Sequence, residues 1–196
     1  MSKINSPWLK ESRLRIGHLN INHAKNKLTE ISSILTNSGK NFHIFGFSET
    51  RLSNVITNSD ISIPSYNIVC RDPAQSRGTG ILLYIHQSIR LKRIQTLEQN
   101  HVETVWIEVQ IKYCKPFLLC FLYRNPAEKV DWYNCFISMM DDAYDYSEDI
   151  IILGDFNIDL LKENNHWKQT FKSFALSQII ESPTGVTDSS KTLIDH

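Results

Sequence analysis

The chain has 196 residues, of which 41% are hydrophobic and 21% are charged, and its formal net charge is zero. This composition is typical of a folded domain and excludes an intrinsically disordered chain. No apolar run approaches the roughly 18 residues of a membrane span, and residues 1–13 form a polar leader without the apolar stretch of a secretory signal. We therefore expect an intracellular protein without a membrane segment, with one domain over residues 14–196.

The first half of the chain predicts alternating strands and helices. Residues 14–20 (LRIGHLN) read as a strand, and residues 25–40 follow with the apolar spacing of a helix. Residues 42–50 (FHIFGFSET) are an apolar run of strand length, and residues 51–65 are rich in loop-forming residues. Two further strand-like runs within residues 66–86, separated by an RGTG turn, predict a hairpin.

The second half of the chain also predicts both strands and helices. Residues 102–111 alternate as a half-buried strand does, and residues 117–123 predict its antiparallel partner. Helical apolar spacing returns in residues 130–145 and again in residues 166–181. Between them, residues 149–157 (DIIILGDFN) read as a buried strand that ends in a polar loop. Because strands outnumber helices and hairpins mix with helices, we expect an α/β layered domain with mostly antiparallel sheets.

Charge and cysteine usage add weaker information. Residues 1–40 carry seven Lys or Arg against two Glu, whereas residues 128–163 carry ten Asp or Glu against two Lys. This asymmetry suits a metal-dependent site that also binds phosphates, and equally suits two solvated surfaces of opposite charge. The four cysteines lie far apart without a CxxC pair, so we expect free thiols with no part in catalysis: Cys70, Cys114, Cys120 and Cys135.

The strongest local signal is Gly154-Asp155-Phe156-Asn157, directly after the apolar run. A strand that ends in this way projects Asp155 and Asn157 from its end, where sites of α/β proteins lie. The carboxylate can accept a proton or orient a water, and the amide can donate to a phosphoryl oxygen without adding charge. A plain turn made of turn-forming residues explains the same motif.

Three other polar motifs have the same ambiguity. Glu49 follows an apolar strand, where it can ligate Mg²⁺ or merely cap the next segment. Asn20 and Asn22, at the end of the first strand, have the period-two spacing of one strand face but are also turn formers. Asp195 and His196 join an acid to an imidazole, which can serve a metal or a proton transfer, at the last two positions of the chain.

Taken in order, the motifs N-x-N, S-E-T, G-D-F-N and T-L-I-D-H resemble those of the endonuclease/exonuclease/phosphatase superfamily, from about Arg15 to His196. Four segments are also similar to elements of the endonucleases of non-LTR retrotransposons: residues 48–50 (SET), 77–81 (RGTGI), 121–126 (FLYRNP) and 192–196 (TLIDH). The resemblance implies the DNase I-like fold, a two-sheet α/β sandwich flanked by helices. It also implies that the chain, which stops at His196, lacks the C-terminal strand.

The resemblance further implies a magnesium-dependent endonuclease, with Mn²⁺ as a substitute, that nicks one strand of DNA by contacting its phosphate backbone. Such an enzyme works in the nucleus, within a longer polyprotein that carries a reverse transcriptase. Metal ligands would be Glu49, Asn20 and Asp195, and catalytic residues Asp155, Asn157, His196, Tyr123 and Asn22. Two alternatives stay open: a phosphatase or phosphodiesterase of inositol or lipid headgroups, and a degenerate remnant that binds DNA without cutting it.

Overall fold

The computed structural model describes residues 14–36, 42–52, 56–71, 79–99, 101–127, 131–161, 166–186 and 191–195. Its strands are β1 (Ile16–Asn20), β2 (Ile44–Ser48), β3 (Tyr66–Arg71), β4 (Ile81–His86), β5 (Arg90–Arg93), β6 (Glu103–Gln110), β7 (Phe117–Tyr123), β8 (Ile150–Asp155), β9 (Gly185–Val186) and β10 (Lys191–Thr192). Its helices are α1 (Leu28–Thr36), α2 (Trp132–Tyr146) and α3 (His166–Ser173), with 3-10 turns η2 (Ala24–Lys27) and η3 (Gln95–Leu97).

The strands form two four-stranded mixed sheets and a short two-stranded ribbon of β9 and β10. The first sheet has the order β1-β2-β4-β3, and the second has the order β5-β6-β7-β8. In each sheet one pair is parallel, β1 with β2 and β7 with β8, while the other neighbours run antiparallel. The hairpins of β3 with β4 and of β6 with β7 confirm the predicted antiparallel partners.

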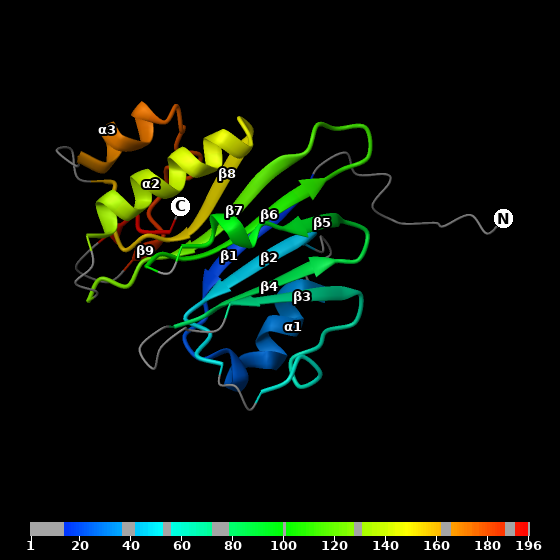
Figure 1. Cartoon of the computed structure of the whole chain (residues 1–196). Helices are drawn as coiled ribbons and strands as arrows, with labels where there is room; N and C mark the ends of the chain where they lie inside the picture. Colours follow the sequence, from blue (N-terminus) through cyan, green and yellow to red (C-terminus); the bar gives the residue numbers. More distant parts are fainter. Residues whose placement is uncertain are drawn as a thin grey trace.

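The two sheets stack face to face, and helices cover their outer faces (Figure 1). α1 lies on the first sheet, whereas α2 and α3 lie on the second. Each interface has its own apolar cluster, because each sheet offers one set of alternating side chains to its partner sheet and the other set to the helices. The predicted fold class, a two-sheet sandwich with flanking helices, is confirmed.

The sheets approach closely where β2 crosses β7. Gly46 of β2 makes room for the ring of Phe121 on β7, since a Cβ atom added at Gly46 would lie 2.2 Å from a ring carbon. Phe121 is 1% exposed. This contact brings the central strands of the two sheets together, and with them the loops that follow.

Two strands are buried differently from the prediction. The strand of residues 103–110 is buried on both faces, because it packs against β2 and β4 on one side and under α2 and η3 on the other. The strand of residues 150–155 was predicted to be buried, but it is the edge strand of its sheet, and Ile151 is 36% exposed. β5 was not predicted, because its sequence RLKR has the composition of a surface segment.

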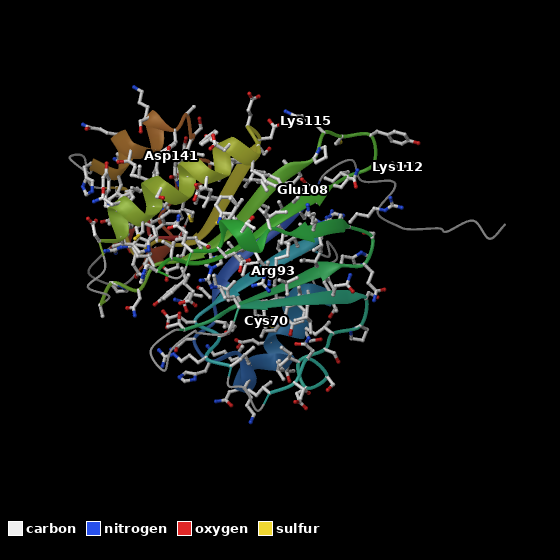
Figure 2. The ribbon with its side chains drawn as sticks, viewed as in Figure 1. Cys70, Arg93, Glu108, Lys112, Lys115 and Asp141 are labelled. Atoms are coloured by element: carbon white, nitrogen blue, oxygen red, sulfur yellow. The ribbon has the colours of Figure 1, made fainter. Side chains whose placement is uncertain are left out.

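β1 and β8 are edge strands on one side of the sandwich, the β1–β8 edge, and β3 and β5 are the edge strands on the other side. On that other side, polar contacts connect β3 to the second sheet. Arg93 donates to both carboxylate oxygens of Glu98 at 2.8 Å and to the carbonyl oxygen of Cys70 at 2.9 Å. Arg71 donates to the carbonyl oxygens of Thr104 and Gln99, each at 2.7 Å. Arg93 and Cys70 lie beside each other in Figure 2. We call Arg71, Arg93 and Glu98 the arginine clamp.

The structure also bears on the cysteines and on membrane-spanning helices. None of the four cysteines forms a disulfide bond, and Cys114 is the exposed one among them. Within the part of the chain that the structure describes, none of the helices is long and apolar enough to cross a membrane.

Candidate active site

Four strands end at one place. Asn20 is the last residue of β1, Glu49 directly follows β2, Tyr123 is the last residue of β7 and Asp155 is the last residue of β8. Because β1 and β2 are parallel, and β7 and β8 are parallel, the carboxyl ends of both pairs point the same way within each sheet. The stacking of the sheets brings the two sets of ends together, although the residues come from distant parts of the chain.

The side chain of Asn20 connects the two sheets. Its Nδ2 donates to Glu49 Oε1 at 2.7 Å and to Asp155 Oδ2 at 2.9 Å. An amide nitrogen carries two hydrogens, so one asparagine can satisfy both carboxylates. The predicted convergence of Asn20, Glu49 and Asp155 is therefore present in the structure.

Tyr123 reaches the same cluster from the second sheet. Its hydroxyl donates to Glu49 Oε1 at 3.2 Å, and the residue is 4% exposed. Burial and the negative charge of Glu49 raise the pKa of Tyr123. The phenol therefore stays protonated near neutral pH, where it serves as a hydrogen-bond donor.

The fold changes the acidity of Asp155. Burial raises its pKa to about 6, and the negative charges of Asp195 and Glu49 act in the same direction. Hydrogen bonds from the Asn20 side chain and the Asn157 backbone oppose the rise. A carboxyl group that titrates near pH 6 is suited to accept a proton near neutral pH.

The backbone before Asp155 requires glycine. Gly154 has φ of +150°, and a Cβ atom there would lie 1.8 Å from the carbonyl oxygen of Leu122 on the neighbouring strand. Only glycine avoids this collision. The close approach of β8 to β7 places Asp155 directly opposite Tyr123 in the strand register.

Asn157 lies in the loop that follows β8. Its backbone N–H donates to Asp155 Oδ1 at 3.0 Å, and its Nδ2 donates to the carbonyl oxygen of Arg124 at 2.9 Å. Arg124 Nη1 donates back to the carbonyl oxygen of Asn157 at 3.3 Å. These bonds fix the amide beside Asp155, and its second N–H hydrogen is available to a substrate oxygen.

Asn22 has a smaller part in the cluster than its spacing suggests. β1 ends at Asn20, so the strand alternation does not extend to Asn22, which is exposed. Its backbone N–H donates to Asn20 Oδ1 at 3.2 Å. Asn22 therefore helps to orient Asn20 through the main chain.

The loops of the site hold unusual backbone conformations. Five of their non-glycine residues have positive φ values, between 42° and 72°: Asn22, His23, Glu49, Arg51 and Asn157. Such conformations cost energy, and they persist where the surrounding structure enforces them, often at functional sites. Here the enforcing contacts include main-chain bonds from His23 to Glu49 and from Arg51 to Thr79.

Asp195 approaches the site from the C-terminal segment. It forms an isolated antiparallel bridge with Asp155, and the Phe156 N–H donates to the carbonyl oxygen of Ile194 at 2.9 Å. Burial raises the pKa of Asp195. The predicted partner, His196, lies outside the described residues.

His18 is a site neighbour that the sequence did not reveal. It lies two residues before Asn20 on β1, and its side chain is 7% exposed. Its Nε2 is 3.2 Å from Ser48 Oγ, and its Nδ1 is 3.8 Å from Asp195 Oδ1. The shared strand face of His18 and Asn20 was the available signal, but a histidine within an apolar strand has many structural explanations.

The donor set fits a hard divalent cation in part. All candidate ligand atoms are oxygens, as Mg²⁺ requires, and Asp195 Oδ1 is buried without a hydrogen-bond partner among the described residues. Among the described residues, no group of three or more His, Cys, Asp or Glu is arranged so that it could hold a metal ion. Asn20 points its amide nitrogen at the carboxylates, so binding through Oδ1 would require the amide to rotate.

Comparisons with known proteins concern the fold. No protein-family model matches the chain, and no curated protein matches it. Among solved structures, the endonuclease domain of TRAS1, a telomere-specific non-LTR retrotransposon, matches with a TM-score of 0.68 and 14% identity. That match covers 93% of this chain and 82% of the TRAS1 domain.

Two other solved structures have the same architecture. The catalytic domain of Xenopus laevis APE2 matches with a TM-score of 0.61 and 16% identity, over 92% of this chain and 80% of that one. A 3′ phosphatase from Neisseria, bound to a product DNA hairpin, matches with a TM-score of 0.54 and 14% identity, over 81% of this chain and 63% of that one. The chain thus has the DNase I-like fold of these solved structures, which is the fold that the resemblance of its motifs implied.

Proposed function

We propose that this chain hydrolyses phosphodiester bonds in DNA and nicks one strand with the help of Mg²⁺. The observation that carries the proposal is the cluster in which the Asn20 amide bridges Glu49 and Asp155, 2.7 and 2.9 Å away. Two carboxylates held together by a neutral donor, with a protonated phenol beside them, suit the hydrolysis of a phosphate ester.

Each residue takes a distinct role in this proposal. Asp155 orients the attacking water and accepts its proton. Asn157 donates a hydrogen bond to a non-bridging oxygen of the scissile phosphate. The Tyr123 hydroxyl turns its single hydrogen from Glu49 to another of these oxygens when the substrate binds, and Asn22 keeps Asn20 in place. His196 would stabilise the charge that develops on the phosphorus centre, or transfer a proton there.

Glu49 would hold the cation, with Asn20 and Asp195 beside it. A bound Mg²⁺ would neutralise charge on the phosphate in the transition state. Arg51 Nη2 lies 3.3 Å from Glu49 Oε2 and is largely exposed, so this arginine can move aside for a cation. The protein contributes mainly positioning and electrostatics, because hydrolysis by water needs no covalent intermediate on the chain.

DNA as the substrate is supported by the solved neighbours, which include the endonuclease domain of a retrotransposon and a phosphatase bound to a DNA hairpin. We extend the proposal to the chemistry of such endonucleases, which leaves a 3′-hydroxyl end from which a reverse transcriptase primes. We further propose that the chain acts on nuclear DNA as part of a longer polyprotein with a reverse transcriptase.

The test compares substrate classes under one set of conditions. The chain is incubated with supercoiled plasmid, with an inositol polyphosphate and with sphingomyelin, each with Mg²⁺, with Mn²⁺ and with EDTA. We expect nicked circles in the presence of either cation, none with EDTA, and ends that a DNA polymerase extends directly. Turnover of the headgroup substrates alone would replace the proposal with a headgroup phosphodiesterase, and inactivity on all three with retained DNA binding would indicate a remnant.

A further inference from the structure

His18 lies against the site without any assigned role. It belongs to β1, and strand alternation places it on the same face as Asn20. Its side chain is 7% exposed, and such burial favours the neutral ring over the charged one. A neutral imidazole has one N–H donor and one acceptor nitrogen, and which nitrogen holds the proton depends on its neighbours.

The two neighbours of the ring select one tautomer. Nδ1 faces Asp195 Oδ1 at 3.8 Å, and that oxygen is buried without a hydrogen-bond partner among the described residues. A lone pair on Nδ1 would repel the carboxylate, whereas an N–H group is attracted to it. Nε2 then acts as an acceptor for the Ser48 hydroxyl, 3.2 Å away.

We infer that His18 is a positioning residue, which holds Asp195 in the site through its Nδ1–H group while Ser48 fixes the ring. The inference rests on the proposed function. The bridge to Asp155 ties Asp195 to the second sheet, and His18 supplies the matching tie to the first sheet. Asp195 is thereby fixed relative to both Asn20 and Asp155.

Variants of His18 separate this role from simple packing. Asparagine places its amide nitrogen near the position of Nδ1, whereas glutamine places its amide nitrogen near that of Nε2. We expect His18→Asn to nick plasmid within about threefold of the wild-type rate. We expect His18→Gln and His18→Ala to lower kcat about 10–100-fold with little change in KM, as loss of a residue that orients a metal-site carboxylate does.

The matched control is His86→Ala. His86 is a second partly buried histidine, it bonds a serine hydroxyl at 2.8 Å, and it lies at the far end of β4. This variant should keep the wild-type kcat. If His18→Asn loses as much kcat as His18→Gln, or if His18→Gln keeps the wild-type kcat, the positioning role is wrong.

A second measurement does not depend on activity. Nitrogen NMR of the full chain with ¹⁵N-labelled histidine, in EDTA at pH 7, reports which ring nitrogen of His18 carries the proton. The Nδ1–H tautomer supports the inference, and the Nε2–H tautomer overturns it even if the chain nicks DNA. A chain with the Nδ1–H tautomer that fails to nick would refute the proposed function and leave the contact between His18 and Asp195 intact.

Discussion

At the scale of single residues, Asp155 shows how a site can reduce the stability of the fold that carries it. The side chain is 3% exposed, and burial raises its pKa from 3.8 to about 6. The folded chain therefore binds the Asp155 proton more tightly than the unfolded chain does. The contribution of Asp155 to stability is fully present below about pH 4 and is lost as the pH rises through about 6.

Because ionisation of Asp155 destabilises the folded chain, replacing it with a side chain that cannot ionise should stabilise the fold. The Asp155→Asn variant cannot ionise at this position, so at pH 7 in EDTA it should be more stable than the wild type by about 1–3 kcal/mol. Urea unfolding at pH 4 and pH 7 measures the effect, and the gap between the two proteins should shrink at pH 4. A gap that does not depend on pH would show that Asp155 ionises in the fold as easily as in the unfolded chain.

Tyr123→Phe removes one hydroxyl from the site. Glu49 would keep its bond from Asn20, so the free energy of unfolding should change by only about 1 kcal/mol. The nicking rate should fall about 10–100-fold, because the scissile phosphate loses the hydrogen bond that the Tyr123 hydroxyl would donate to it.

The control for Tyr123 is Tyr84→Phe. Tyr84 is fully buried, and its hydroxyl donates to the carbonyl oxygen of Ile61 at 2.6 Å, within the core under α1. That variant should lose about 1–2 kcal/mol and keep its nicking rate. If both variants lost activity in proportion to their stability, the hydroxyl of Tyr123 would have no special function.

The sequence predicted Asn20, Glu49 and Asp155 as candidates because each ends or follows an apolar run that reads as a strand, whereas Tyr123 was implied by the resemblance alone. Asn20, Glu49, Tyr123 and Asp155 share this placement, and their order along the chain resembles a known pattern. His18 lies inside such a run, so no local signal separates it from a core histidine. Its contact with Asp195 depends on two segments 177 positions apart in sequence, which local patterns do not encode.

At the scale of elements, β8 was predicted from its apolar sequence but its exposure was not. Apolar runs indicate burial on both faces, yet β8 lies at a sheet edge. Ile152 packs against the cluster under α2, whereas Ile151 is 36% exposed. Both residues were expected to be buried, and for Ile151 this expectation was wrong.

The pair Ile152→Ala and Ile151→Ala tests the orientation of β8. Ile152→Ala should lower the free energy of unfolding by about 2–3 kcal/mol, and Ile151→Ala by less than about 1 kcal/mol. Urea unfolding of the two variants side by side measures the difference. Equal losses would mean that β8 is covered on both faces.

α3 also ended earlier than its apolar spacing predicted. The helix stops at Ser173, and Ala175 takes the left-handed conformation with φ of 52°. The Leu176 N–H donates to the carbonyl oxygen of Phe171, and the Ala175 N–H to that of Lys172, which is the Schellman pattern of a helix end. Glycine usually marks such an end, and here alanine occupies the position, so the sequence offered no stop signal.

At the scale of the whole molecule, polar links join the two sheets at both open edges. The site spans the β1–β8 edge through Asn20, and the arginine clamp spans the β3–β5 edge. Glu98 balances two arginines there, and its side chain is 8% exposed. The clamp has no sequence signature, because its members are far apart and only the stacking of the sheets brings them together.

Glu98→Gln tests the clamp. The substitution keeps the shape of the side chain but removes the counter-charge of Arg93 and the larger of two that act on Arg71, so it should lower the free energy of unfolding by about 2–4 kcal/mol. Lys115→Ala is the matched control, because its ion pair with Asp149 at 2.8 Å is exposed and should leave the urea midpoint unchanged. Lys115 lies at the β6–β7 turn in Figure 2. A Glu98→Gln variant as stable as the control would show that packing alone holds the sheets.

The central claim is that the cluster at the β1–β8 edge hydrolyses DNA. The most direct measurement is the initial rate of plasmid nicking in Mg²⁺ by the wild type, by Asp155→Asn and by Asp141→Asn, which alters an exposed carboxylate on α2. We predict that Asp155→Asn is at least about 100-fold slower than the wild type and that Asp141→Asn is unchanged. Equal rates for the wild type and a folded Asp155→Asn would contradict the account.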